Sequence, residues 1–177
     1  MDKLITRFKN GDKSAFEEIV KRLQNQLLLI AKSRLNNQSL ADDVVQETFI
    51  CLFKNARKIK NVSKFKSWIT IVLINKCNKL MKQKKIVEIS YDQENFENFL
   101  QTEQEYENIT NNIDFINYIS FLNIEERTII SMFYSQNYTI KEIAEILKLS
   151  ENTIKSKILR AKNKIKNRLG GRENGQK

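Results

Sequence analysis

Apolar residues recur along this chain at three- and four-residue spacing, which is the period of helices that bury one side. No stretch alternates apolar and polar residues convincingly, as a half-buried strand does. Proline is absent and the four glycines stand at positions 11, 170, 171 and 175, so neither residue type interrupts the long central part of the chain. The pattern therefore predicts an all-α fold.

The apolar pattern is lost in one segment. Residues 86–112 mix acidic, Asn and Gln residues with scattered aromatics and carry no sustained stripe, which is typical of a linker. The flanking patterns predict two small helical domains, over residues 1–85 and 113–170. Residues 171–177 are predicted to form a flexible tail.

Charge follows the same division. The net charge of the chain is +10, to which residues 1–85 contribute +12, residues 86–112 contribute −7 and residues 113–177 contribute +5. Two basic domains joined by an acidic linker indicate binding to a polyanion, for which nucleic acid is the default.

Composition argues against an enzyme. Histidine is absent, which removes the commonest general base, the usual catalytic triads and most zinc sites that combine histidine with cysteine. Cys51 and Cys77 are isolated on apolar helical patterns, as small helix residues are. We find no Gly-rich phosphate loop or paired-carboxylate motif, so we expect no catalytic site, metal or cofactor. No apolar run approaches a membrane span of roughly 18 residues and residues 1–7 lack signal-peptide character, so a cytoplasmic protein without membrane insertion is expected.

The clearest local motif lies in the C-terminal block. Thr139 and Glu142 fit a capping box at the start of a short helix that runs to about Leu147. Lys148 and the next residue turn the chain, and Ser150 is a natural N-cap for the following helix. Helix, three-residue turn and helix form the helix-turn-helix signature. A left-handed conformation at Lys148 would cost about 1 kcal/mol.

Helical projection divides the last helix into two sides. The apolar side holds Ile154, Ile158, Ala161, Ile165 and Leu169. The polar side holds Asn152, Lys155, Ser156, Leu159, Arg160 and Asn163. Short polar groups and cations on one face suit a helix that enters the major groove. The flanking cations are placed to reach phosphates, with a solvated basic helix as the alternative; they are Lys157, Lys162, Lys164, Lys166 and Arg168.

These C-terminal residues resemble region 4 of bacterial sigma factors. Residues 122–130 are similar to the opening of that region, and residues 138–147 and 153–162 to its helix-turn-helix, the latter close to the family's T-V-K-S-R-L-x-R-A-R string. Two-component regulators share a related helix-turn-helix, so this half alone leaves a regulator open. The resemblance implies that the −35 promoter element is read by Lys155, Ser156, Leu159 and Arg160. Asn152, Thr153 and Asn163 lie beside them at the start and on the polar side of the helix and are expected to contact it as well.

The most specific string is Ala41-Asp-Asp-Val-Val-Gln-Glu-Thr-Phe49, which resembles A-E-D-L-V-Q-E-T-F of sigma region 2.2. Projection buries Ala41, Val44, Val45, Thr48, Leu52 and Ala56. The outward residues are Asp42, Asp43, Gln46, Glu47 and Ile50. An acidic face with an exposed apolar residue, inside a domain of charge +12, suits a protein partner better than DNA. The resemblance implies that this face binds the β′ clamp helices of RNA polymerase.

Residues 63–82 resemble sigma regions 2.3 and 2.4, with F-x-x-W-L read here as Phe65-Lys-Ser-Trp-Ile69 and an Asn seven residues after the Trp. An aromatic residue and amides on a cationic surface suit the capture of an unpaired strand, although Trp68 alone fits a core position equally well. Projection buries Ile69, Val72, Leu73, Cys77 and Leu80 and exposes Trp68, Ile71, Asn75, Asn78, Lys79 and Lys82. The resemblance implies that a −10 base is received by the loop Asn61, Val62, Ser63, Lys64 and Phe65, and that Asn75 contacts its neighbour. The exposed Trp68, Asn78, Lys79 and Lys82 are expected to contact the same element. The chain departs from the family at Ile71, Lys79 and Asn123, where Arg, Asp and Pro are common.

Over nearly its whole length the chain thus resembles the extracytoplasmic-function (group IV) sigma factors of the sigma-70 family. The resemblance implies a sigma factor that binds core RNA polymerase through β′ and the β flap, melts the −10 region and holds the −35 element as duplex. An anti-sigma partner is expected as well, although no segment specifies one. The length leaves no room for a sigma region 1.1 or region 3 domain, so self-inhibition is not expected.

Two alternatives are open at this level. A dimeric helix-turn-helix regulator that acts without promoter melting would need a dimerisation or effector domain, which residues 1–85 do not resemble. A nuclease or integrase would need a carboxylate metal cluster, for which Asp42, Asp43 and Glu47 are the only compact acidic group.

Overall fold

The computed structural model describes residues 1–84 and 112–170, and every regular element within these two ranges is a helix. The predicted all-α class is confirmed. The predicted linker, apart from residue 112, and the predicted tail lie outside the described residues. Within the described ranges, no helix is both long and apolar enough to cross a bilayer.

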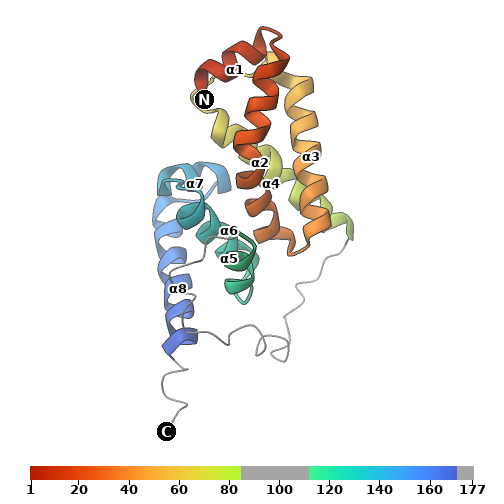
Figure 1. The fold of residues 1–177 in the computed structure, drawn as a ribbon. Helices are drawn as coiled ribbons and strands as arrows, with labels where there is room; N and C mark the ends of the chain where they lie inside the picture. Colours follow the sequence, from red (N-terminus) through yellow and green to blue (C-terminus); the bar gives the residue numbers. More distant parts are fainter. Residues whose placement is uncertain (85–111, 171–177) are drawn as a thin grey trace.

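The N-terminal domain is built from four α-helices and one 3-10 turn. They are α1 (Asp2–Lys9), α2 (Lys13–Leu35), α3 (Gln38–Asn55), η1 (Ala56–Lys58) and α4 (Phe65–Lys84). Asp12 caps α2, because its carboxylate accepts hydrogen bonds from the backbone N–H groups of Ser14 and Ala15, and Asn37 caps α3 in the same way. The long helix α2 packs against α1, α3 and α4, which makes it the centre of this domain (Figure 1).

The C-terminal domain holds four α-helices and a π-helical turn. They are α5 (Asn112–Tyr118), α6 (Ile124–Ile130), η5 (Ser131–Ser135), α7 (Ile140–Leu147) and α8 (Glu151–Gly170). Asn123 is the N-cap of α6 and forms a capping box with Glu126. The long helix α8 packs on α6 and α7.

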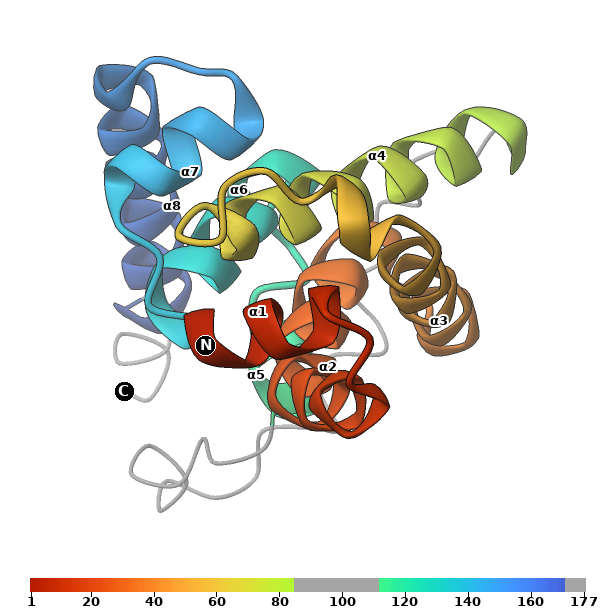
Figure 2. The same cartoon turned by 90° about the horizontal axis from the view of Figure 1, so that it is seen from above.

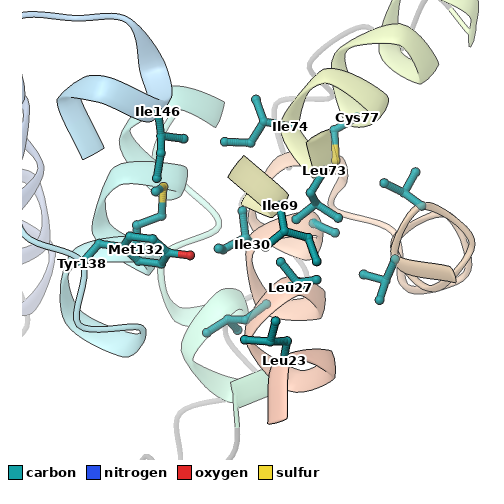
Figure 3. Packing of buried hydrophobic residues seen from close by; sticks show 14 of the residues in the cluster. Leu23, Leu27, Ile30, Ile69, Leu73, Ile74, Cys77, Met132, Tyr138 and Ile146 are labelled. Carbon is teal, nitrogen blue, oxygen red and sulfur yellow. The ribbon is translucent and has the colours of Figure 1, made fainter. Parts of the chain in front are cut away.

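The two domains pack against each other, a point that the sequence left open. Helices α2 and α4 contact elements of the C-terminal domain, whereas α3 lies on the far side of the N-terminal domain (Figures 1 and 2). In Figure 3, Ile74 of α4 faces Ile146 of α7, and Met132 and Tyr138 lie toward Ile30 of α2. All five residues are buried, so one continuous core runs through both domains.

Candidate nucleic-acid and partner interfaces

The helix-turn-helix forms as its sequence predicts. The Thr139 hydroxyl accepts a hydrogen bond from the backbone N–H of Glu142 (3.2 Å), and the Glu142 carboxylate accepts one from the backbone N–H of Thr139 (2.8 Å). Burial opposes ionisation of Glu142, but its carboxylate accepts hydrogen bonds from both the backbone N–H and the hydroxyl of Thr139 and lies near the Lys66 ammonium, so the pKa of the carboxyl group is lowered. Lys148 ends α7 in the left-handed conformation (φ 57°, ψ 43°). The Ser150 hydroxyl accepts from the backbone N–H of Thr153 (3.1 Å) at the start of α8.

The outward face of α8 is open to solvent. Its exposed residues are Asn152, Lys155, Ser156, Leu159, Arg160 and Asn163, with Thr153 half-buried beside them. Leu159 is 60% exposed, the largest value among the exposed large apolar residues of the described ranges. Beneath this face, Ile154 and Ala161 are fully buried and Ile158 nearly so. A groove of about 310 Å³ runs along the first turns of the helix.

Four of the five flanking cations are already engaged within the domain. Lys157 pairs with Glu125 (2.7 Å) and Lys164 with Glu126 (2.8 Å), whose side chain is only 7% exposed. The Arg168 guanidinium lies 4.6 Å from the centre of the Phe121 ring, and the Lys162 ammonium lies 5.4 Å from the centre of the Tyr134 ring. These contacts attach α8 to the rest of the domain, so they compete with phosphate contacts by these four side chains. Exposed cations such as Lys155 and Arg160 of the outward face are better placed to contact phosphates.

Helix α3 presents the outward face that projection predicts. Asp43, Gln46, Glu47 and Ile50 are exposed, and Asp42 is half-buried. The opposite side is fully packed, with the six predicted positions buried together with Phe49. The Glu47 carboxylate accepts a hydrogen bond from the Lys76 ammonium of α4 (2.8 Å), so it also serves the contact between α3 and α4.

An aromatic residue that projection did not include extends this face. Phe53 follows Ile50 by three residues, and the two side chains are 52% and 53% exposed. The Phe53 ring lies 5.1 Å from that of Phe16 and 6.1 Å from that of Phe8. The spacing of Gln46, Ile50 and Phe53 is a sequence signal that could have revealed it. We call these residues the α3 surface: Asp42, Asp43, Gln46, Glu47, Ile50 and Phe53.

The loop before α4 is held in a defined turn. The Asn61 side-chain oxygen accepts hydrogen bonds from the backbone N–H (3.0 Å) and the hydroxyl (2.7 Å) of Ser63. Lys9 of α1 donates to the carbonyl of Ile59 (2.6 Å) just before the loop. Asn61, Ser63 and the following lysine are exposed. The Phe65 ring is only 1% exposed, so it supports the loop from below and offers no surface to a base in this arrangement.

The predicted −10 residues of α4 fall into two groups. Asn75, Lys79 and Lys82 are exposed, whereas Trp68 and Asn78 are half-buried. The Trp68 ring lies 6.0 Å from the buried Phe65 ring, centre to centre. One part of the Trp68 ring is therefore covered and the other part is open to solvent. The Asn78 side-chain oxygen is occupied by a hydrogen bond from Arg34 of α2 (2.6 Å).

A groove of about 670 Å³ lies where α4 meets the C-terminal domain. Its wall on the α4 side is formed by Ile71, Ile74, Asn75, Asn78 and Met81. The other wall includes Asn123, Ile146 and Lys148. Two predicted −10 residues therefore lie opposite the helix-turn-helix, an arrangement that no local pattern in the sequence indicated.

The cysteines take no part in these surfaces. Cys77 is fully buried, and burial raises the pKa of its thiol to about 11; Cys51 is half-buried and also free. Within the described ranges, no group of three or more potential metal ligands comes together.

Two family models match this chain. Sigma-70 region 2 matches residues 19–86 and sigma-70 region 4 matches residues 114–165, and together they cover more than half of the chain. A curated relative, the ECF RNA polymerase sigma-E factor of Haemophilus influenzae, is 26% identical over 94% of this chain and 93% of its own length.

Two solved structures are similar over most of their lengths. The structure of CnrH in complex with the cytosolic domain of CnrY matches with a TM-score of 0.69 and 20% identity, over 96% of this chain and 97% of the other. The sigma factor RpoE from Bartonella quintana, in complex with the anti-sigma factor NepR, matches with a TM-score of 0.67 and 18% identity, over 88% of this chain and 96% of the other. At these identities the likeness is one of fold.

Proposed function

This chain belongs to the sigma-70 family as a sigma factor of the extracytoplasmic-function type, and from that premise we propose that it binds core RNA polymerase, recognises a promoter and opens it for transcription initiation. The observation that carries the proposal is one chain that combines the α3 surface with an exposed helix-turn-helix. A helix-turn-helix regulator that acts without melting is not favoured, because residues 19–86 match sigma region 2.

The α3 surface is the proposed attachment to the polymerase β′ clamp helices. Its carboxylates stand out in a domain of charge +12, and Ile50 and Phe53 offer apolar area that is costly to leave in water. Apolar anchors surrounded by charge are typical of specific protein interfaces. Because α3 lies away from the C-terminal domain, this surface is accessible in the closed arrangement of the two domains.

Promoter melting is assigned to the loop before α4 and to α4 itself. We propose that Lys79 and Lys82 hold phosphates of the unpaired strand, while the ordered loop at Asn61 and Ser63 receives a flipped base. Asn75 would contact the neighbouring base through its exposed amide. Trp68 is placed to stack with the part of its ring that Phe65 leaves free.

The −35 element is assigned to the outward face of α8. Arg160 can bind a guanine edge with two hydrogen bonds, and Leu159 can contact a thymine methyl group. Lys155 and Ser156 lie one turn closer to the helix start, where groove contacts concentrate in helix-turn-helix proteins.

The remaining partners follow from the family. We propose that the C-terminal domain also contacts the β flap and that the chain acts in the cytoplasm, where polymerase and promoter are. The related fold of RpoE is bound by an anti-sigma factor, which supports an anti-sigma partner for this chain.

A pair of lysine substitutions on the α3 surface tests the attachment to polymerase. Asp43→Lys with Gln46→Lys leaves Glu47 and its ion pair with Lys76 in place, so folding of the domain is spared. We expect affinity for core polymerase, measured by fluorescence anisotropy of labelled chain, to fall at least about tenfold because opposed charges become like charges. The matched control is Glu17→Lys with Gln24→Lys on the exposed side of α2, which makes the same change of charge and is expected to bind normally.

Transcription provides the second measurement. Core polymerase with the wild-type chain should initiate at defined sites on a library of genomic fragments, and the Asp43→Lys, Gln46→Lys variant should not. Normal binding by this variant would refute the α3 assignment. Absence of specific initiation by the wild-type chain would refute the function itself.

A further inference from the structure

The loop to which the proposed function assigns a flipped base is held between two buried side chains. Ile59 is 5% exposed and Phe65 is 1% exposed, whereas every residue between them except Val62 is open to solvent. The start of α4 fixes the second half of the loop, because the Phe65 N–H donates a hydrogen bond to the carbonyl of Val62 (3.1 Å). We call residues 60–64 the base-receiving loop.

The entrance of the base-receiving loop is attached to α1. The ammonium of Lys9, the last residue of α1, donates a hydrogen bond to the carbonyl of Ile59 (2.6 Å) across 50 positions of sequence. Within residues 1–84 and 112–170, it is the only hydrogen bond that joins the backbone of residues 59–64 to an element other than η1 and α4. A carbonyl held in this way fixes the planar peptide group that follows it, and hence the direction in which the chain enters the loop.

Helix α1 gives Lys9 a rigid support. The Phe8 ring is 6% exposed and lies 5.1 Å from the Phe16 ring of α2. Arg7 and Asp12, on either side of the turn that ends α1, form an ion pair (2.6 Å). Helix α1 also contacts η1 directly, and Lys9 is half-buried at this contact (Figure 1). The ammonium is therefore a fixed point against which the loop entrance is set.

The position of Lys9 is not explained by charge pairing. Residues 54–66 carry six cations and no carboxylate, so a further cation is repelled there. The group that the Lys9 ammonium contacts is a backbone carbonyl, which carries no net charge. Phosphates of a bound strand would neutralise these cations and remove the repulsion. An arrangement that opposes the local charge in the free protein indicates that the hydrogen bond itself is what the position requires.

Recognition of a single base depends on accurate placement of a few groups. Groups that select a ligand must be held to within about 0.5 Å, which a loop achieves only when its ends are fixed. Without the Lys9 hydrogen bond, the entrance would be held by the buried Ile59 side chain and by the hydrogen bond from the Ile59 N–H to Ala56 (3.2 Å). Neither of these fixes the peptide group that leads to Asn61.

We propose that Lys9 is a positioning residue for base recognition, because its ammonium holds the Ile59 carbonyl and thereby sets the base-receiving loop without itself touching the base. The proposal rests on the proposed function of this loop. No local motif indicated Lys9, since its partner lies 50 positions away in the sequence. Selectivity at one promoter position therefore depends on α1, an element to which projection and motif gave no role.

Lys9→Met and Lys9→Arg test this role. Methionine keeps an unbranched apolar stem but has no donor, whereas arginine keeps a charged donor. The measurement is the rate of promoter opening by core polymerase with each variant, followed by permanganate reactivity, on a mapped promoter and on versions with single substitutions through its −10 and −35 elements. We expect Lys9→Met to lose about tenfold in discrimination at one −10 position and none elsewhere, because only the displaced loop loses its contact. Lys9→Arg should retain most of that discrimination.

Lys3→Met is the matched control. It removes the same charge from an exposed position on α1 and should leave discrimination unchanged at every promoter position. A double variant shows whether Lys9 acts through the loop. Because Asn61→Ala releases the turn at Ser63, adding Lys9→Met to it should cost little further discrimination. Circular dichroism checks folding, and Lys9→Leu, which also lacks a donor, should lose discrimination at the same position as Lys9→Met.

Three results would overturn the positioning role of Lys9. They are unchanged discrimination in Lys9→Met and Lys9→Leu, an equal loss at all −10 positions, and additive losses in the double variant with Asn61→Ala. Absence of specific initiation by the wild-type chain would instead count against the proposed function, on which the role of the loop depends.

Discussion

Arg160 and Leu159 are neighbours on the exposed face of α8, and each has a property that is unusual for a surface position. Leu159 exposes most of its apolar side chain within a cationic surface. Arg160 is exposed and has no opposed carboxylate among the salt bridges of the described residues, in contrast to Lys157 and Lys164. A free guanidinium beside a free apolar group matches the hydrogen-bonding edges and methyl groups of the major groove.

At the residue scale we therefore expect Arg160→Ala to weaken recognition of the −35 element by about 1–3 kcal/mol, the worth of a bidentate base contact. The measurement is the affinity of the polymerase complex for the mapped promoter and for versions with single −35 substitutions. Lys166→Ala, at an exposed flanking cation, is the control, because loss of a phosphate contact weakens all sequences alike and lowers the salt dependence of binding by about one ion. Unchanged discrimination in Arg160→Ala would remove this residue from the reading face.

The C-cap residues of two helices differ in how much backbone strain they carry. Lys148 is the C-cap of α7 and Asn36 is the C-cap of α2, and both residues are left-handed, with φ of 57° and 47°. Asparagine tolerates this conformation because its short polar side chain bonds locally, whereas lysine has no such compensation. The turn of the helix-turn-helix therefore carries strain that the end of α2 largely avoids.

At the element scale, Lys148→Gly should raise the free energy of unfolding by about 1 kcal/mol, because glycine adopts a left-handed conformation without steric cost. Asn36→Gly should change it by only a few tenths of a kcal/mol. Urea unfolding of the full chain measures both. A gain at Asn36 as large as that at Lys148 would contradict the assignment of strain to the turn.

Across the whole molecule, Tyr138 connects the titration of one side chain to the packing of two domains. Burial disfavours the phenolate, the Thr70 hydrogen bond partly offsets this and the nearby Glu142 adds to it, so that the pKa of Tyr138 rises from 10.0 to about 12. A folded-state pKa above the unfolded one contributes stability that is complete below pH 10 and is lost between pH 10 and pH 12.

The dependence of the free energy of unfolding on pH in alkaline solution is the corresponding measurement. Between pH 9 and pH 11 the free energy of unfolding of the wild-type chain should fall by about 1.4 kcal/mol more than that of Tyr138→Phe. Lys66, whose pKa burial lowers, titrates in both proteins and cancels in the comparison. Identical pH dependence in the two proteins would show that the Tyr138 hydroxyl is not buried in solution.

Much of each domain followed from the chain alone, for reasons that can be named residue by residue. The capping box at Thr139 and the N-cap at Ser150 involve neighbours in sequence, so a local pattern was enough to locate the helix-turn-helix. The buried and outward sides of α3 followed from a period of 3.6 residues. Projection missed Thr70 on α4 because a second buried side requires a partner that the helix cannot specify by itself.

The sequence by itself determined the helices, their caps, the faces of α3 and α8 and the motifs that place the chain in its family, since each depends on residues a few positions apart. Only the tertiary structure decided that Tyr138 meets Thr70, that Lys157 and Lys164 are committed to ion pairs, and that the two domains are closed upon each other. These contacts join residues between 32 and 94 positions apart. They form only when distant parts of the chain fit together, and a pattern that repeats every few residues does not encode such contacts.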